Sequence, residues 1–252
     1  MYSKFKIHHI YLLQIFLVFI VVILLSFKPN KEQILKYNSN VYLKNIPEPS
    51  DIVYDSQSNH FYIVSDHGKL FECANDGKII RKAQKEGLDF EGVEVKDSFI
   101  YVSDETPRKV YQYRKSDLSL VKIFSVKCGG ALNKAYESIT YNYTKNCFVM
   151  ISQQPAIIVE YDEQFNEISR KKFNIGRDIS AARWYNGKFY IISSKDACLY
   201  VCEATKYDVQ QYYKINVINA EGLAFDANGK MLITSDDLQR LYFFNQLPNI
   251  KQ

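Results

Sequence analysis

Short runs of alternating apolar and polar residues recur along most of this chain, and five of them begin with a similar motif. The motif has a polar or acidic residue, then a small one, then alternating apolar positions, and its copies are Ser50-Asp51-Ile52-Val53-Tyr54, Glu91-Gly92-Val93-Glu94-Val95, Glu137-Ser138-Ile139-Thr140-Tyr141, Ser180-Ala181-Ala182-Arg183-Trp184 and Glu221-Gly222-Leu223-Ala224-Phe225. Because they begin at residues 50, 91, 137, 180 and 221, they lie 41, 46, 43 and 41 residues apart. Alternation with period two predicts β-strands, and repetition at this spacing predicts five similar units.

Each motif is followed by further strand-like runs. Second strands that end in polar residues are expected at residues 61–66, 100–104, 148–153, 190–194 and 231–236. Asn186-Gly187 and Asn228-Gly229 precede two of these runs and are strong hairpin signals. Third strands are expected at residues 69–73, 109–113, 157–161, 198–202 and 240–244, and fourth strands at 78–82, 120–126, 168–173 and 209–215. The last unit therefore lacks a fourth strand.

A strand-like run at residues 41–46 precedes the first unit and supplies a candidate for the missing strand. A propeller closes its ring by pairing an N-terminal strand into the last blade, which removes an exposed sheet edge. We therefore predict an all-β fold over residues 41–252, a five-bladed β-propeller of four-stranded blades closed in this way. A β-sandwich with accidental similarity among its strands is the alternative.

An uncharged hydrophobic run, residues 10–27, precedes the repeats. As a helix with a rise of about 1.5 Å per residue it spans about 27 Å, close to the thickness of a bilayer core. It closes with LLSFK at residues 24–28 rather than with the small residues of a cleavage site. We therefore expect an uncleaved transmembrane signal anchor at residues 1–28, with a cleaved signal peptide or a buried core helix as alternatives.

The anchor predicts where the remaining domain lies. Basic residues flank the hydrophobic run on both sides, and we expect the N-terminus inside and the propeller on the outer side of the cytoplasmic membrane, facing the periplasm or the cell exterior. Residues 29–40 are polar, lack an apolar period, and predict a short tether.

The charge of the chain argues against a nucleic-acid partner. The formal net charge is +4, and four basic residues lie beside the hydrophobic run, at positions 4, 6, 28 and 31. Without these four charges the remainder is near neutral, so it lacks the basic surface that nucleic-acid binding requires.

The first residue of each motif is the most informative candidate for chemistry. Since the first strand of each blade lines the channel of a propeller, these residues form a ring, namely Ser50, Glu91, Glu137, Ser180 and Glu221. Three crowded carboxylates must be protonated, solvated or neutralised by a cation. No Lys or Arg occupies a ring position, and a hard cation with flexible oxygen coordination, Ca²⁺, suits such a site. Zinc is disfavoured because the four histidines show no metal-type spacing.

Further oxygen ligands and two alternatives accompany this hypothesis. Asp178, just ahead of an inner strand, and Asp51 are the next candidate ligands. Alternatively, Arg177 or Arg183 neutralises the ring, or the glutamates cap turns at a watery mouth. The Ser-Asp ends of second strands are expected to be turn residues rather than ligands, at Asp66, Asp104 and Asp236.

Several of these motifs together resemble the SdiA-regulated, or YjiK-like, family of bacterial proteins, over residues 41–244. The resemblance rests on Glu48-Pro49-Ser50-Asp51-Ile52, Phe90-Glu91-Gly92-Val93, Asp178-Ile179-Ser180-Ala181, Ala220-Glu221-Gly222-Leu223-Ala224 and Ile233-Thr234-Ser235-Asp236. It implies a five-bladed propeller behind an N-terminal membrane segment, distantly related to NHL-repeat propellers, with a bound calcium ion. The acidic positions to which it assigns the ion are Glu91, Glu137, Glu221 and Asp178.

Two functions are compatible with these expectations. The first is a non-catalytic, calcium-binding propeller, anchored in the membrane, that binds an unknown protein or small molecule. The alternative is a metal-assisted hydrolase or lyase, similar to lactonases, in which axial calcium polarises a carbonyl group or activates water. We predict no catalytic residue, because the chain has no G-x-S-x-G motif and His67 lies in an expected turn.

Overall fold

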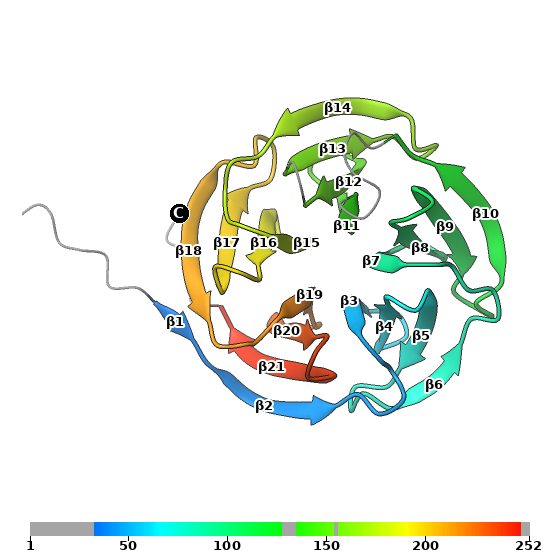
Figure 1. Ribbon diagram of the computed structural model, residues 1–252, viewed down its shortest axis with the longest axis horizontal. Coiled ribbons are helices and arrows are strands. Elements are labelled where there is room, and N and C mark those ends of the chain that lie inside the picture. Colours follow the sequence, from blue (N-terminus) through cyan, green and yellow to red (C-terminus); the bar gives the residue numbers. More distant parts are fainter. Residues whose placement is uncertain (1–32, 128–134, 154–155, 248–252) are drawn as a thin grey trace, which may run out of the picture. The chain divides into compact units, whose positions relative to one another are not determined.

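The computed structural model describes residues 33–127, 135–153 and 156–247. These residues form twenty-one strands and no helix, arranged as five sheets around a central axis (Figure 1). The prediction of an all-β, five-bladed propeller with four-stranded blades is confirmed. The part of the chain that the structure describes includes no helix able to span a membrane, and the expected anchor at residues 1–28 lies outside it.

The blades share one strand order, from the axis to the rim. The innermost strands are β3 (Pro49–Asp55), β7 (Phe90–Lys96), β11 (Tyr136–Asn142), β15 (Ile179–Tyr185) and β19 (Ala220–Phe225). The second strands are β4 (His60–Ser65), β8 (Phe99–Asp104), β12 (Cys147–Ser152), β16 (Lys188–Ser193) and β20 (Lys230–Ser235). The third strands are β5 (Lys69–Cys73), β9 (Lys109–Arg114), β13 (Ile157–Tyr161), β17 (Cys198–Glu203) and β21 (Arg240–Gln246). The fourth strands that follow in sequence are β6 (Ile79–Lys82), β10 (Leu120–Ser125), β14 (Glu167–Lys172) and β18 (Val209–Ile215).

Two strands that precede blade 1 extend other blades. β2 (Tyr37–Tyr42) pairs antiparallel with β21, with Tyr42 opposite Arg240, and is the fourth strand of blade 5. β1 (Ile34–Leu35) pairs parallel with β18 and adds a fifth strand to blade 4.

The position of β2 corrects the expectation of a strand at residues 41–46 behind a tether at 29–40. Residues 37–40 already belong to the strand, whereas Leu43 and Ile46 lie in the turn that follows it. Both side chains are fully buried in the cluster between blades 1 and 5, and Asn45 has a positive φ of 69° that suits a turn. The apolar pattern therefore located a buried turn. Residues 37–40 form a strand at the exposed rim, where polar side chains are tolerated, so this strand has no apolar pattern.

Burial decreases from the axis to the rim. The apolar side chains form five clusters, for example one that joins Val53 and Tyr62 of blade 1 to Val93 and Ile100 of blade 2. All six residues of β14 are exposed. Neighbouring blades therefore pack against each other through the faces of their inner strands. This packing fixes the positions of the innermost strands around the channel.

Candidate functional site

A β-bulge occurs at the same position in all five innermost strands. In blade 1, Pro49 pairs with Ser65 and Asp51 pairs with Val64, so the residue between them is left out of the ladder. The residues skipped in the five blades are Ser50, Glu91, Glu137, Ser180 and Glu221. A bulge redirects the side chain that it displaces, and the five bulges fall on the predicted ring residue for residue.

The ring glutamates interact electrostatically across the channel. Burial raises the pKa of Glu91, Glu137 and Glu221 well above the usual value, and the carboxylates of neighbouring blades raise it further. Glu137 acts on Glu91, and Glu221 and Asp178 both act on Glu137. The four predicted metal-binding residues therefore lie at one mouth of the channel.

Two further sets of acidic residues surround this ring, and of their six members sequence reasoning assigned only Asp178 to the site. One set lies two residues before a ring position, at Glu48, Asp89 and Asp178. The other set directly follows a second strand, at Asp66, Glu105 and Asp236. Backbone hydrogen bonds hold the two sets together, because Asp66 N donates to Glu48 O over 3.2 Å and Glu105 N to Asp89 O over 2.8 Å. We call these six residues and the three ring glutamates the acidic mouth.

The closest carboxylates of the acidic mouth belong to blade 2. Oxygen atoms of Asp89, Glu91 and Glu105 all lie within 4.8 Å of one another. Glu105 accepts a hydrogen bond from Ala135 N over 2.7 Å, and burial, with the nearby charge of Asp89, raises the pKa of its carboxyl group. Carboxylates this close repel one another, so ionisation of the whole group is unfavourable unless a cation binds.

Few basic groups offset this charge among the described residues of the acidic mouth. His67 Nε2 lies 3.0 Å from Glu48 Oε2, and Lys195 Nζ lies 2.8 Å from Asp178 Oδ2. Asp178 is thus already ion-paired, which distinguishes it from the ring glutamates. Arg177 does not neutralise the ring, because its Nε lies 2.8 Å from Asp196 Oδ1 and its side chain is 76% exposed.

Asp66 joins the first blade to the site, although it was expected to be only a turn residue. Its carboxylate accepts a hydrogen bond from Ser50 Oγ. Burial raises the pKa of Asp66 to about 6, and repulsion by Asp89, Glu48 and Asp236 adds to the shift. By contrast, Asp104 does have the expected turn role, since it accepts hydrogen bonds from the backbone N–H groups of residues 88 and 89.

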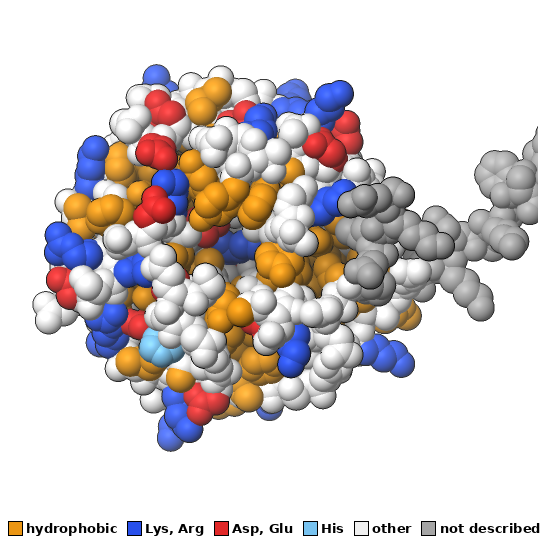
Figure 2. Space-filling view, turned by 180° about the vertical axis from the view of Figure 1, so that it is seen from behind, with side chains coloured by type: hydrophobic (Ala, Val, Ile, Leu, Met, Phe, Trp, Pro, Cys, Tyr) orange, Lys and Arg blue, Asp and Glu red, His pale blue; other side chains and the backbone are white. Residues whose placement is uncertain are grey.

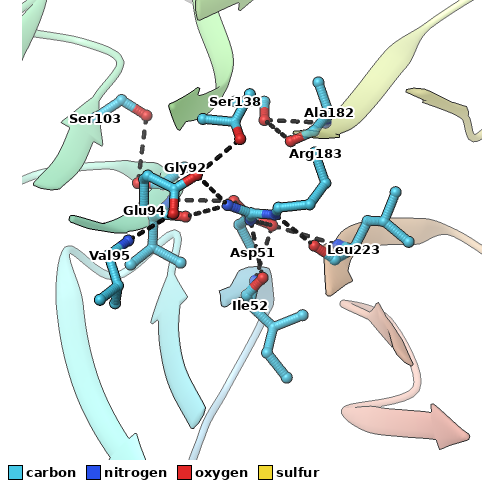
Figure 3. A network of polar contacts seen from close by, with 12 residues as sticks. Asp51, Ile52, Gly92, Glu94, Val95, Ser103, Ser138, Ala182, Arg183 and Leu223 are labelled. Atoms are coloured by element: carbon cyan, nitrogen blue, oxygen red, sulfur yellow. Dashed lines mark hydrogen bonds and ion pairs between the residues drawn. The ribbon is translucent and has the colours of Figure 1, made fainter. Parts of the chain in front are cut away.

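Below the ring, the guanidinium of Arg183 crosses the channel from blade 4 (Figure 3). Its Nε donates to Leu223 O over 2.8 Å, Nη1 to Val93 O over 2.9 Å, and Nη2 to Ile52 O over 2.9 Å. These carbonyls belong to blades 5, 2 and 1, so one side chain binds the backbones of three other blades.

Two buried carboxylates complete this network. Arg183 Nη2 also donates to Asp51, and Nη1 donates to Glu94 Oε2 over 3.2 Å. All five N–H groups of the guanidinium are therefore used. Burial raises the pKa of Asp51 to about 6, although Arg183 and three backbone N–H groups lower it. Asp51 belongs to this network rather than to the acidic mouth, and Arg183 pairs with Asp51 and Glu94 rather than with the ring.

The missed acidic residues had a signal in the sequence. The second strand runs antiparallel to the first, so its last residues lie beside the first residues of the inner strand. The acidic residues that follow a second strand, at 66, 105 and 236, are therefore placed at the same mouth as the ring.

Comparisons with known proteins agree with this fold. The family model described as SdiA-regulated matches residues 35–245. No sequence among the curated proteins matches the chain. Among solved structures, the chain is similar to a glutaminyl cyclase of Myxococcus xanthus, with 10% sequence identity and a TM-score of 0.68, covering 86% of this chain and 100% of the cyclase. At this identity the likeness concerns the fold alone.

Proposed function

This chain belongs to the SdiA-regulated family, and we propose that it is a calcium-binding β-propeller that binds a ligand or partner protein on the outer side of the cytoplasmic membrane. The observation that carries the proposal is the acidic mouth, where nine carboxyl groups gather with two basic partners among the described residues. Carboxylates held in this way require protons or a cation.

The donor set fits calcium. All nine groups offer hard oxygen atoms, and Ca²⁺ takes about six to eight such ligands at roughly 2.4 Å. Two oxygens on one ion can then be at most about 4.8 Å apart, and the oxygens of Asp89, Glu91 and Glu105 satisfy this limit. We propose these three residues and Glu137 as the principal ligands. Glu221 lies within electrostatic reach of the group, and Asp178 contributes less because of its ion pair with Lys195.

A bound calcium ion would supply positive charge to the mouth, where it could bind an anionic group of a ligand. The protein supplies the remaining features. The bulges aim the ring side chains from separate blades, and the backbone hydrogen bonds fix the surrounding acidic residues. Because Glu105 belongs to blade 2 and Glu137 to blade 3, their shared site joins two blades.

Membrane attachment is part of the proposal and rests on the sequence. Residues 10–27 carry no charged side chain, and their length as a helix suits a bilayer core. We propose that this segment anchors the propeller with its ligand-binding faces outside the cytoplasm. Alkaline carbonate extraction of cell membranes tests the anchor, because a peripheral protein is released and an anchored one stays in the pellet.

Carboxyl groups with raised pKa values, such as Glu221, can act as general bases beside a metal, so a metal-assisted hydrolase is the second candidate. Binding is proposed first because the calcium site itself accounts for these carboxylates. The imidazole of His67 is half exposed and bonded to Glu48, and the fold shared with a glutaminyl cyclase does not by itself supply an activity.

Calcium binding is tested with the full-length chain in a non-ionic detergent. After treatment with a chelator, calorimetric titration with Ca²⁺ is expected to show a saturable site, and a calcium concentration of 100 times Kd is expected to stabilise the fold by about 2.7 kcal/mol. Glu91→Gln with Glu105→Gln is expected to weaken binding at least tenfold. The matched control is Glu163→Gln, which changes a half-exposed carboxylate paired with Lys96. An unchanged affinity in the double variant, or no response to calcium, contradicts the proposal.

A further inference from the structure

The opposite mouth of the channel holds a cavity of about 390 Å³. The innermost strands all run away from the acidic mouth, and the cavity is lined by residues at or near their far ends, including Asp55, Glu94 and Tyr185. Figure 2 shows a face of the propeller with hydrophobic side chains around a central hollow and a Lys or Arg side chain within it. Arg183 lines the cavity, and its network with Asp51 lies between the cavity and the acidic mouth.

Aromatic side chains form much of the cavity wall. We call this end of the channel the aromatic mouth and define it by Tyr54, Tyr143, Trp184, Tyr185 and Phe225. Tyr185 stacks on Phe225 with ring centroids 4.3 Å apart and an angle of 12° between the ring planes. The rings of Tyr143 and Trp184 lie 5.0 Å apart, and Tyr143 is 49% exposed. The rings are thus held by mutual packing, and one of them remains open to solvent.

The charged groups of the cavity carry an excess of negative charge. Its lining contains four acidic and two basic side chains, namely Asp55, Glu94, Asp97, Asp226, Lys115 and Arg183. If every group is ionised, the lining has a net charge of −2, and Lys96, which pairs with Asp97 over 2.7 Å, reduces this to −1. Asp51, which lies behind Arg183, adds a further negative charge above its pKa of about 6.

Both basic groups of the lining are already committed to partners. Lys115 Nζ donates to Asp55 over 2.9 Å and to Gln57 over 2.8 Å. Arg183 uses all of its N–H groups within the network of the channel. An anionic ligand would therefore have to displace an existing ion pair.

Among the described residues, Asp55, Glu94 and Asp97 pair with Lys115, Arg183 and Lys96. Asp226 forms no ion pair there and retains capacity for a cation. Within its turn, Asp226 accepts hydrogen bonds from Asn228 N and Lys230 N through Oδ1. Burial, with the nearby charges of Glu94 and Asp97, raises the pKa of the Tyr143 hydroxyl to about 12. The aromatic mouth thus combines electron-rich rings with negative potential.

We propose that the aromatic mouth binds a small organic cation, either a protonated amine or a quaternary ammonium group. Aromatic faces attract such cations through their quadrupole, and Trp and Tyr do so most strongly. The size of the cavity is within the usual range for small-molecule sites. This site is separate from the acidic mouth, so its test does not depend on calcium binding there.

The chain offers a direct reporter for this test. It contains a single tryptophan, Trp184, which lines the cavity. The tryptophan fluorescence of the full-length chain in a non-ionic detergent is followed during titration with choline chloride, with potassium chloride as the control for ionic strength. The neutral isostere 3,3-dimethylbutan-1-ol is titrated in parallel. A saturable change with choline, and binding of the isostere that is about tenfold weaker, are expected.

Variants at the rim of the cavity complete the test. Tyr143→Leu removes an exposed ring and is expected to weaken choline binding about fivefold or more, whereas Tyr143→Phe keeps the ring and should stay within about twofold. Equal affinity for choline and its neutral isostere would show a neutral apolar pocket and overturn the proposal. No saturable response to choline, or an unchanged affinity in Tyr143→Leu, also overturns it.

Discussion

Arg183 Nη2 lies 3.0 Å from Asp51 Oδ2, so a guanidinium of blade 4 is paired with a carboxylate of blade 1 across the channel. The side chains are 5% and 0% exposed. The carboxylate also accepts hydrogen bonds from Ile52 N, Val93 N and Leu223 N, at 2.8, 2.9 and 3.3 Å. The pair and its backbone partners therefore connect four of the five blades at the axis.

Removing Arg183 is expected to destabilise the propeller strongly. In Arg183→Leu the buried carboxylates of Asp51 and Glu94 lose their counter-charge, and loss of one partner of a buried ion pair costs about 3 to 5 kcal/mol. Arg183→Lys is expected to rescue little, because an ammonium has three donors where the guanidinium uses five. Urea unfolding measures the change.

The control for this prediction is Arg177→Leu. Arg177 is 76% exposed and pairs with Asp196 at the surface, so its loss is expected to cost less than about 1 kcal/mol. Similar losses in Arg177→Leu and Arg183→Leu would contradict a central role for the channel network.

The stability of the calcium-free protein is expected to fall as the pH rises from about 4 to 7. The pKa values of Glu91, Glu137 and Glu221 are raised in the folded state, and those of Asp51 and Asp66 are raised to about 6. The folded state therefore holds protons that the unfolded chain has already released. The stability that these groups contribute is fully present below about pH 4, and it is lost as the pH rises through their pKa values in the folded state.

Calcium is expected to reverse part of this dependence, since the ion replaces the protons and its affinity rises as the carboxyl groups ionise. The rise in Tm on adding Ca²⁺ to chelator-treated protein should be larger at pH 7.5 than at pH 5. A rise in Tm of equal size at both pH values would place the ion away from the carboxyl groups whose pKa is raised.

Neutralising one ring position is expected to weaken calcium binding and to stabilise the calcium-free protein. Glu137→Gln removes a carboxylate that is repelled by Glu105, Glu221 and Asp178, so the calcium-free variant should gain about 1 kcal/mol in the free energy of unfolding. The same variant should bind calcium less tightly. Glu163→Gln, in the turn between β13 and β14, is expected to change neither quantity, and a destabilised Glu137→Gln protein would show that the acidic mouth is not under repulsion.

The turn after β2 is expected to contribute more to stability than its exposed neighbours. Ile46 is fully buried between blades 1 and 5, and Ile46→Ala should cost about 2 to 5 kcal/mol through lost burial and the cavity left behind. Tyr42 is 56% exposed, and Tyr42→Ala should cost less than about 1 kcal/mol. Thermal unfolding of the two variants compares them, and equal losses would mean that the turn is not part of the core.

Much of the architecture was predictable because propeller blades repeat in sequence. The five ring residues were found from a shared motif, although the β-bulges that aim them are not visible as a pattern of apolar positions. The partners of Arg183 could not be predicted in the same way. They come from blades 1, 2 and 5, and contacts across the channel depend on the shape of the closed ring rather than on spacing along the chain.

The same limit explains the acidic residues that were missed. Asp89 and Glu105 lie outside the repeated motif, and they reach Glu91 only because backbone hydrogen bonds fold the ends of two strands together. The aromatic mouth was not predicted at all, since its rings come from strand ends and loops in four blades. Trp184 was identified only as a residue of a repeated motif, and Tyr143 was not singled out.

The pairing of β2 with β21 has a consequence for folding while the chain is being synthesised on the ribosome. Tyr37 lies opposite Phe244, so a strand synthesised near the beginning must wait for a strand synthesised near the end. Until β21 is synthesised, the edges of β2 and β20 that it will cover remain open. A polypeptide released before residue 240 keeps both open edges. Truncated products are therefore expected to join edge to edge and aggregate, whereas the full-length chain can satisfy both edges within itself.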